Sequence, residues 1–306
     1  MSSEPARPGA SAAVRDAVPD AAALAERLAA VDYLADEGLA TAMFLAVRLP
    51  QPLLLEGEAG VGKTEAAKAL AQSLDTPLVR LQCWEGIDSS EALYEWNYPR
   101  QLLAIRLAEA SGRDVSEHDL FSREYLIRRP LLAALEYEGE LPAVLLVDEL
   151  DRADDDFEAF LFELLAESSV TIPELGTVRA KQPPVVVLTS NRTRDLHDAL
   201  KRRCLYHWID YPSAEREVAI VRRRVPGSAE QLVTDAAGAL QRLRAADVQK
   251  PPGIAEAIDW VAALELLGVE RLDAAAADRT LGSVLKYRED QELVRAQGLE
   301  RLVPGG

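Results

Sequence analysis

The eight residues from Gly57 to Thr64, GEAGVGKT, match the pattern G-x-x-x-x-G-K-[ST] in full, and the fold prediction starts from them. A short apolar run at residues 52–56, PLLLE, precedes them, and a helical pattern extends from Thr64 to Leu74. Strand, glycine-rich loop and helix in this order favour phosphate binding, because the glycines let successive backbone N–H groups turn toward phosphate oxygens at a helix N-terminus. A structural glycine-rich turn, the alternative, does not require this flanking order.

Each part of this loop has an expected task. We expect Lys63 to contact the β- and γ-phosphates and the Thr64 hydroxyl to bind Mg²⁺. The residues expected to surround the nucleotide phosphates are Gly57, Glu58, Ala59, Gly60, Val61, Gly62, Lys63, Thr64 and Glu65. The sequence therefore predicts ATP or ADP as ligand, together with Mg²⁺.

Further apolar runs outward from the loop indicate the rest of a sheet. They are LVRLQ (78–82), AVLLVD (143–148), PVVVLTS (184–190) and LYHWIDY (205–211). Helical stretches separate most of them, and this alternation predicts an α/β fold with a parallel sheet covered on both faces. After Pro212 the strand signal ends, so we expect an α/β nucleotide-binding domain over 21–211 and a small all-helical domain over 212–306.

The N-terminal region divides into two parts. Residues 1–20 are rich in Ala, Ser and Pro without periodicity, which predicts a disordered tail. From Ala21 to Val47, spaced Leu and Ala residues predict two helices, one on either side of a break at residues 36–38.

Composition narrows the class of protein. The chain has 34 basic and 51 acidic residues, a net charge of −17, which disfavours binding to nucleic acid or anionic membranes. No apolar run reaches the roughly 18 residues of a membrane span. Cys83 and Cys204 lie far apart without metal-ligand spacing, and the first residues lack the apolar stretch of a secretory signal. We therefore expect a cytoplasmic location.

Asp148 and Glu149 follow directly after an apolar run. Two carboxylates are costly inside a core, so we expect both to emerge at the carboxyl end of the strand. There Asp148 can bind Mg²⁺ through a water molecule, and Glu149 can orient and polarise the water that attacks ATP. The alternative is an acidic helix N-terminus, because more acidic residues follow: Asp151, Asp154, Asp155 and Asp156.

Two further candidates follow along the chain. Asn191 ends the run VVVLTSN, where a neutral polar side chain can contact the γ-phosphate and the water; the alternative is a turn-forming Asn. Arg202 and Arg203 precede the last predicted strand, and an arginine there can neutralise charge on the transferred phosphoryl group. The alternative for this pair is a solvated basic helix end.

These motifs together resemble the MoxR class of AAA+ ATPases, and within it the CoxD-like subgroup linked to maturation of aerobic carbon monoxide dehydrogenase. The resembling stretches are PLLLEGEAGVGKTEAAKALA, LLVDELDRADDDFEAFLFELLAE, VVVLTSNRTRDLHDALKRRCLYHWIDYPSAERE and KPPGIAEAIDW. The resemblance implies a three-layer α-β-α core with a five-stranded sheet in the order 5-1-4-3-2, followed by a helical lid. It also implies that Asn191 is the first sensor and that Arg203, or else Arg202, is the arginine finger.

The family likeness implies two projections that face a pore or a client protein. The first corresponds to residues 84–101, which contain four aromatics: Trp84, Tyr94, Trp96 and Tyr98. Aromatics are frequent contact anchors, and the equally weighted alternative is that they attach the insertion to the sheet. The second corresponds to Ser168–Ala180, whose turn Pro173-Glu174-Leu175-Gly176 suits a hairpin.

The lid departs from the family pattern. Many members have a γ-phosphate-sensing arginine where this chain has Glu256. A carboxylate repels phosphate, so Glu256 is not expected to do that task. Another lid residue such as Lys250 can replace it, or nothing does.

The resemblance implies a homo-oligomer, a hexameric ring, that acts with a von Willebrand factor A domain protein. Its expected work is chaperone-like remodelling or maturation of a client, such as metal-centre assembly in a carbon monoxide dehydrogenase-like metalloenzyme. The alternative is a nucleotide-gated scaffold or signalling switch in a stress or antiviral assembly. The water-orienting carboxylate of Glu149 favours ATP turnover over a pure switch.

Overall fold

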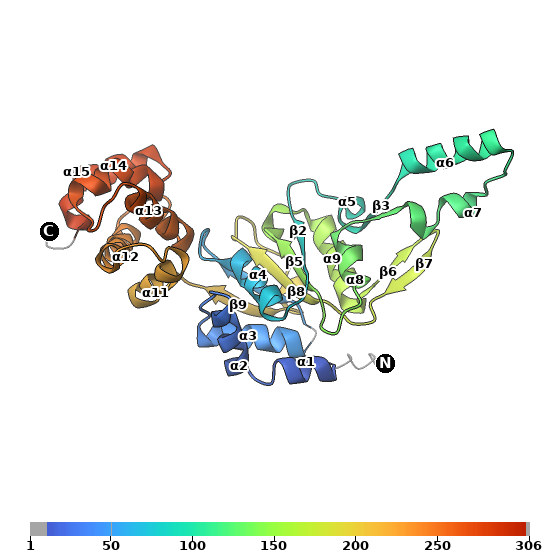
Figure 1. Cartoon of the computed structure of the whole chain (residues 1–306), viewed down its shortest axis with the longest axis horizontal. Coiled ribbons are helices and arrows are strands. Elements are labelled where there is room, and N and C mark those ends of the chain that lie inside the picture. The colour runs from blue at the N-terminus through green and yellow to red at the C-terminus, as the bar shows by residue number, and fades with distance from the viewer. Residues whose placement is uncertain (1–10, 50, 304–306) are drawn as a thin grey trace. The chain divides into compact units, whose positions relative to one another are not determined.

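The computed structural model describes residues 11–49 and 51–303 (Figure 1). By their internal contacts the described residues form two compact units. The first comprises the chain up to Val31 with residues 35–56 and 66–207, and the second comprises residues 32–34, 57–65 and 208 onward. The glycine-rich loop thus groups with the C-terminal helices. The domain limits at 20/21 and 211/212 stay predictions.

A five-stranded sheet forms the centre of the first unit. Its strands are β1 (Leu53–Gly57), β2 (Leu78–Gln82), β5 (Val144–Asp148), β8 (Val185–Ser190) and β9 (Leu205–Ile209). Their spatial order is β2-β5-β8-β1-β9, which is the predicted order 5-1-4-3-2 read from the opposite edge. The pairs β2–β5, β5–β8 and β8–β1 are parallel, and every residue of β1, β5 and β8 is buried. The predicted fold class is confirmed.

Helices pack around this sheet. They include α2 (Ala21–Ala30), α3 (Glu37–Arg48), α4 (Lys63–Ser73), α8 (Pro130–Leu135), α9 (Asp155–Glu167) and the short α10 (Asp198–Lys201). The two helices predicted over 21–47 are present, but the break between them lies at residues 31–36 and not at 36–38. Asp36 caps α3 by accepting the Leu39 N–H at 2.7 Å, so Glu37 and Gly38 belong to the helix.

The predicted tail over residues 1–20 needs a correction. Its first ten residues lie outside the described part, but Ala12–Ala17 form helix α1. The Ser11 side chain caps this helix, and Val14 and Val18 are buried. The apolar side chains were too few to show a helical period in the sequence, yet they bury enough surface to dock the segment.

The insertion after β2 is longer than predicted. It contains α5 (Ser89–Leu93), β3 (Tyr94–Trp96), α6 (Tyr98–Ser111), α7 (Glu117–Leu120), the 3-10 helix η1 (Arg123–Tyr125) and β4 (Leu126–Arg128). Strand β4 returns antiparallel to β3, and α6 projects from the rest of this unit (Figure 1). The bounds 84–101 implied by the family resemblance cover only the first part of this insertion.

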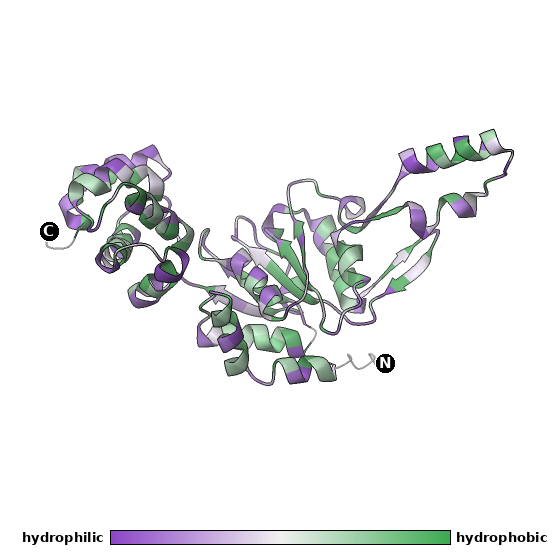
Figure 2. Ribbon diagram, in the orientation of Figure 1, coloured by the Kyte–Doolittle hydropathy of each residue, from purple (hydrophilic) through white to green (hydrophobic). Residues whose placement is uncertain are grey.

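The four aromatics of the insertion divide between the two predicted roles. Trp96 is buried and packs edge-on against Phe121 and Tyr94, with ring centroids 5.1 and 6.1 Å apart, so it attaches the insertion. Trp84 and Tyr98 are exposed. Leucines of α6 are exposed as well, and Figure 2 shows hydrophobic residues along this projecting helix.

The second predicted projection is confirmed as a hairpin. Strands β6 (Ser169–Ile172) and β7 (Gly176–Arg179) pair antiparallel, and the turn between them is the predicted Pro173–Gly176 region. Gly176 adopts a φ of 82°, a conformation that glycine tolerates without strain.

The C-terminal part of the second unit is helical. Its helices are α11 (Ala214–Arg224), α12 (Glu230–Ala245), α13 (Ile254–Leu266), α14 (Ala274–Val284), α15 (Arg288–Gln297) and the 3-10 helix η3 (Leu299–Leu302). They enclose a core around the fully buried Trp260, whose indole N–H donates to Thr280 Oγ1 at 2.7 Å. Among the helices of the described ranges, none has the length and apolarity that crossing a membrane requires.

Candidate nucleotide site

The glycine-rich loop has a curled backbone that depends on its glycines. Gly60 and Gly62 have φ values of 79° and 99°, which side chains rarely allow. At Gly57 an added Cβ would lie 2.5 Å from the Ile209 carbonyl oxygen. The Lys63 ammonium donates to the carbonyl oxygens of Gly57 and Glu58, both at 2.7 Å, and the residue is buried. The loop therefore curls around its own lysine.

Helix α13 docks on this loop within the second unit. The Gly60 carbonyl oxygen accepts the N–H groups of Ile254 and Ala255, at 3.0 and 3.3 Å. A Cβ added to Gly253 would lie 2.7 Å from that same oxygen. Gly253 and Gly60 thus let two backbones approach more closely than any side chain permits.

Glu256 lies beside this contact. Its carboxylate accepts the Gly253 N–H at 3.0 Å, and Glu256 Oε2 lies 2.7 Å from the position of a Cβ on Gly60. The Lys250 side chain is exposed, and its backbone N–H donates to Asp290 Oδ2 at 3.3 Å. The Glu256 carboxylate therefore caps the N-terminus of its own helix next to the glycine-rich loop.

We expect Gly253→Ala to lower the free energy of unfolding by about 1–3 kcal/mol, because the added Cβ overlaps the Gly60 backbone. Gly238→Ala is the matched control: it lies in α12, where a Cβ meets only the Arg242 side chain at 3.5 Å. This control should raise stability by about 0.5–1 kcal/mol, because alanine favours a helix interior over glycine. Urea unfolding measures both, and equal effects of the two substitutions would contradict the close contact.

The carboxyl ends of β5 and β8 carry the second group of candidate residues, in the first unit. Asp148 is buried, with 2% of its surface exposed. Its Oδ2 accepts Arg80 Nε and Nη2 at 3.0 and 2.6 Å, and its Oδ1 accepts the Thr189 hydroxyl at 2.6 Å. Both oxygens of the predicted Mg²⁺ ligand are thus oriented by neighbouring strands.

Glu149 leaves the strand in a left-handed conformation with a φ of 55°. Its backbone N–H donates to Thr189 Oγ1 at 2.9 Å. Its Oε2 accepts Gln82 Nε2 at 3.1 Å and pairs with Arg152 Nε at 2.9 Å. Such a strained turn holds the side chain at the edge of the sheet, where the sequence predicted it.

Asp151 joins the loops after β5 and β8. It lies in the 3-10 helix η2 (Leu150–Arg152) and is buried. Its Oδ1 accepts the Asn191 N–H at 3.2 Å, and its Oδ2 accepts the Thr193 N–H and hydroxyl at 2.9 and 2.6 Å. The Asn191 side chain is half-buried, and Asp151 fixes the backbone that presents it.

The predicted finger residues follow α10. Arg202 and Arg203 are both exposed, and the Arg203 guanidinium stacks over the Phe162 ring with its carbon 4.1 Å from the centroid. The same segment is tied to β1, because Lys201 Nζ lies 3.9 Å from Glu56 Oε1. Tyr206 donates to Glu56 Oε2 at 3.1 Å; burial and this bond raise the pKa of Tyr206, which keeps it a donor.

Sequence reasoning missed Arg80, Gln82 and Thr189, which contact Asp148 or Glu149, and Asp151, which fixes the loop that carries Asn191. A usable signal existed in β2, where LVRLQ places two polar residues two positions apart and hence on one face. Thr189 and Asp151 gave none, because a buried threonine or one more aspartate in an acidic run looks ordinary.

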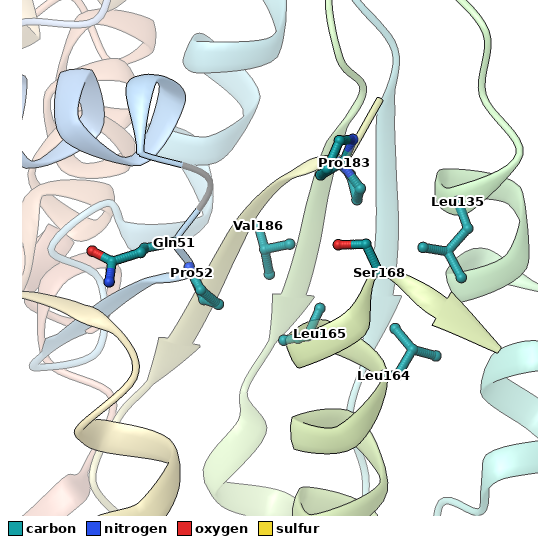
Figure 3. Close-up of a pocket in the computed structure, with 9 residues that line it drawn as sticks. Gln51, Pro52, Leu135, Leu164, Leu165, Ser168, Pro183 and Val186 are labelled. Atoms are coloured by element: carbon teal, nitrogen blue, oxygen red, sulfur yellow. The ribbon is translucent and has the colours of Figure 1, made fainter. Parts of the chain in front are cut away.

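A separate small cavity lies at the amino-terminal edge of the sheet (Figure 3). It measures about 20 Å³, and its lining includes Pro52, Leu164 and Val186. A nucleotide does not fit in it, and its walls offer few polar groups. The candidate residues Asp148 and Glu149 lie instead at the carboxyl ends of the parallel strands.

Comparison with known proteins identifies the family of the chain. The family described as AAA domain (dynein-related subfamily) matches residues 52–204, half of the chain. No curated protein sequence matches. Two similar solved structures are the Thermotoga maritima RuvB Holliday junction branch migration motor and a candidate ATPase from Cytophaga hutchinsonii, both at 15% identity. The first has a TM-score of 0.48 and the match covers 81% of this chain and 68% of that one; the second has 0.46 and covers 94% of each.

Proposed function

This chain belongs to the AAA domain family, dynein-related subfamily, and from that membership we propose that it is a Mg²⁺-dependent ATPase that remodels or matures a partner protein. One observation carries the proposal. The buried Asp148 ends β5 and Glu149 follows it in a left-handed conformation, in a chain that also contains the complete phosphate-loop motif GEAGVGKT. Gly57–Glu65 are proposed to bind the nucleotide phosphates, and Asp148 and Glu149 are proposed to serve metal binding and hydrolysis.

The residues have the chemistry that Mg²⁺ prefers. The Asp148 carboxylate and the Thr64 hydroxyl are hard oxygen donors, and Asp148 is suited to bind through a water molecule. When bound, Mg²⁺ would neutralise charge on the β- and γ-phosphates. Lys63 would bind those phosphates in exchange for the carbonyl oxygens of its own loop.

Glu149 is proposed to orient and polarise the attacking water. Gln82 and Arg152 hold its carboxylate, which accepts hydrogen bonds and so remains an acceptor for a water proton. Asn191, positioned by Asp151, would contact the same water or the γ-phosphate. With the phosphate charge neutralised by Mg²⁺, the protein would have to place the water and accept its proton.

Arg203, or Arg202 beside it, is proposed to reach the nucleotide of a neighbouring copy in a ring. Both guanidinium groups are exposed, as a residue that acts on another subunit must be. A mixture of Arg203→Ala and Glu149→Gln chains, each inactive alone, should regain about a quarter of normal turnover, since about one interface in four pairs an intact glutamate with an intact arginine. Arg202→Ala in place of Arg203→Ala is the matched control.

Phosphate release from the mixed chains measures this expectation. Recovery with the Arg203 variant and full activity of Arg202→Ala alone would assign the finger to Arg203. A mixture that stays inactive would contradict action between copies.

The proposed work on a partner protein rests on the family resemblance and on the exposed leucines of α6, which are Leu102, Leu103 and Leu107. A contiguous exposed apolar surface of this kind suits a protein contact. The finer proposal is a ring that works with a von Willebrand factor A domain protein to assemble the metal centre of a carbon monoxide dehydrogenase-like client. Action in the cytoplasm is part of the same proposal.

The experiment is release of inorganic phosphate from ATP by the purified chain, with and without Mg²⁺. We expect turnover that requires Mg²⁺ and that a partner protein can stimulate. Nucleotide binding without any turnover, even with the partner added, would instead favour the nucleotide-gated scaffold. Phosphate transferred to a small molecule would contradict both.

A further inference from the structure

Arg80 lies in the middle of β2, on the strand next to β5. The register places Arg80 opposite Leu146 and Gln82 opposite Asp148, so the arginine side chain reaches one pair of residues along the sheet to Asp148. Its Nε and Nη2 both donate to Asp148 Oδ2, and Nη2 also contacts Gln82 Oε1. Gln82 in turn holds Glu149. Side chains of one strand, β2, thus contact both carboxylates of the candidate site, Asp148 and Glu149.

Arg80 compensates the charge of Asp148. Only 2% of the Asp148 side chain is exposed, and a buried carboxylate without compensation is strongly unfavourable. Thr189 donates a hydrogen bond to the same carboxylate. Arg80 Nη2 lies 2.6 Å from Asp148 Oδ2, so its positive charge offsets part of the cost of burying this carboxylate.

Arg80 can also give way. Its side chain is 46% exposed, whereas Thr189 is buried at 1%, so the guanidinium has solvent to move into and the hydroxyl does not. A hydrated Mg²⁺ bound at Asp148 would bring a second positive charge to the same carboxylate. Guanidinium and metal then compete, because like charges in one partly buried site repel.

We propose that Arg80 is a positioning residue that compensates Asp148 before the metal arrives and thereby sets how strongly nucleotide binding depends on Mg²⁺. This inference rests on the proposed ATPase function. It predicts that a neutral side chain at position 80 makes nucleotide binding more dependent on Mg²⁺ and makes the metal-free protein less stable.

The test compares binding of a fluorescent ADP in Mg²⁺ and in EDTA, for the unaltered chain and Arg80→Met. The dissociation constant in EDTA divided by that in Mg²⁺ should rise about tenfold in Arg80→Met, because one positive charge that competes with the metal is removed. Arg80→Lys keeps the charge but loses the two-pronged contact, so its ratio should rise only about threefold. Arg106→Met is the matched control, because Arg106 forms an exposed pair with Glu109 on α6 and its loss should leave the ratio unchanged.

A second readout does not involve nucleotide. Arg80→Met should lower the melting temperature in EDTA, and this loss should largely disappear when Asp148→Asn is also present, since position 148 then carries no charge for Arg80 to compensate. An unchanged binding ratio in Arg80→Met and Arg80→Lys, in proteins that bind ADP, would overturn the inference alone. Failure of the unaltered chain to bind any nucleotide would overturn the proposed function, and this inference with it.

Discussion

Phosphate release from ATP should fall by about 10²–10⁴-fold in Glu149→Gln while nucleotide binding persists, because the amide cannot accept a proton from the attacking water. The substitution keeps the size of the side chain and an oxygen that can still accept from Gln82 and Arg152. Position and packing are therefore retained and only the proton acceptor is lost. Steady-state phosphate release and fluorescent-nucleotide binding, measured side by side, separate the two quantities.

Asp156→Asn is the matched control for this substitution. Asp156 is an exposed acidic residue in the first turn of α9, in the same acidic run as Glu149. If the acidic residues served only to favour a helix N-terminus, both substitutions would have similar, small effects. A Glu149→Gln chain with normal turnover would remove the main support for the ATPase mechanism.

Asp151→Ala should lower the free energy of unfolding by about 2–4 kcal/mol, because three donors then lose a buried charged acceptor. Those donors are the N–H groups of Asn191 and Thr193 and the Thr193 hydroxyl. Turnover at a temperature where the variant is folded should also fall, since the backbone carrying Asn191 is no longer fixed. Urea unfolding and phosphate release on the same preparation measure both effects.

Asp155→Ala provides the comparison for the stability effect. Its carboxylate pairs with Arg194 but is largely exposed, at 67%, so its loss should cost less than about 1 kcal/mol. Asp151→Asn, which retains one acceptor oxygen, should fall between the two alanine variants. Equal destabilisation by Asp151→Ala and Asp155→Ala would show that the buried hydrogen bonds do not join the two loops.

Much of the sheet was predictable because its strands are continuous apolar runs bounded by turn residues. Buried strands such as AVLLVD and PVVVLTS can be identified from composition alone. The insertion after β2 was not, because its second half has no apolar period: α6 leaves its leucines exposed, and α7 and β4 are short. Helix α1 escaped prediction for a similar reason, since Val14 and Val18 are the buried residues that dock a segment otherwise rich in Ala and Ser.

The residues proposed to bind phosphate, metal and water could be picked out from the sequence, because GEAGVGKT and the Asp148-Glu149 pair place reactive groups at fixed offsets from strand ends. What holds those groups was decided only by tertiary structure. Arg80 and Thr189 reach Asp148 from 68 and 41 residues away, and Gly253 and Glu256 meet Gly60 across most of the chain. Local sequence encodes strand, loop and helix through short-range sterics and apolar period, whereas charge compensation of a buried carboxylate depends on which strands lie side by side, and that emerges only when the core packs.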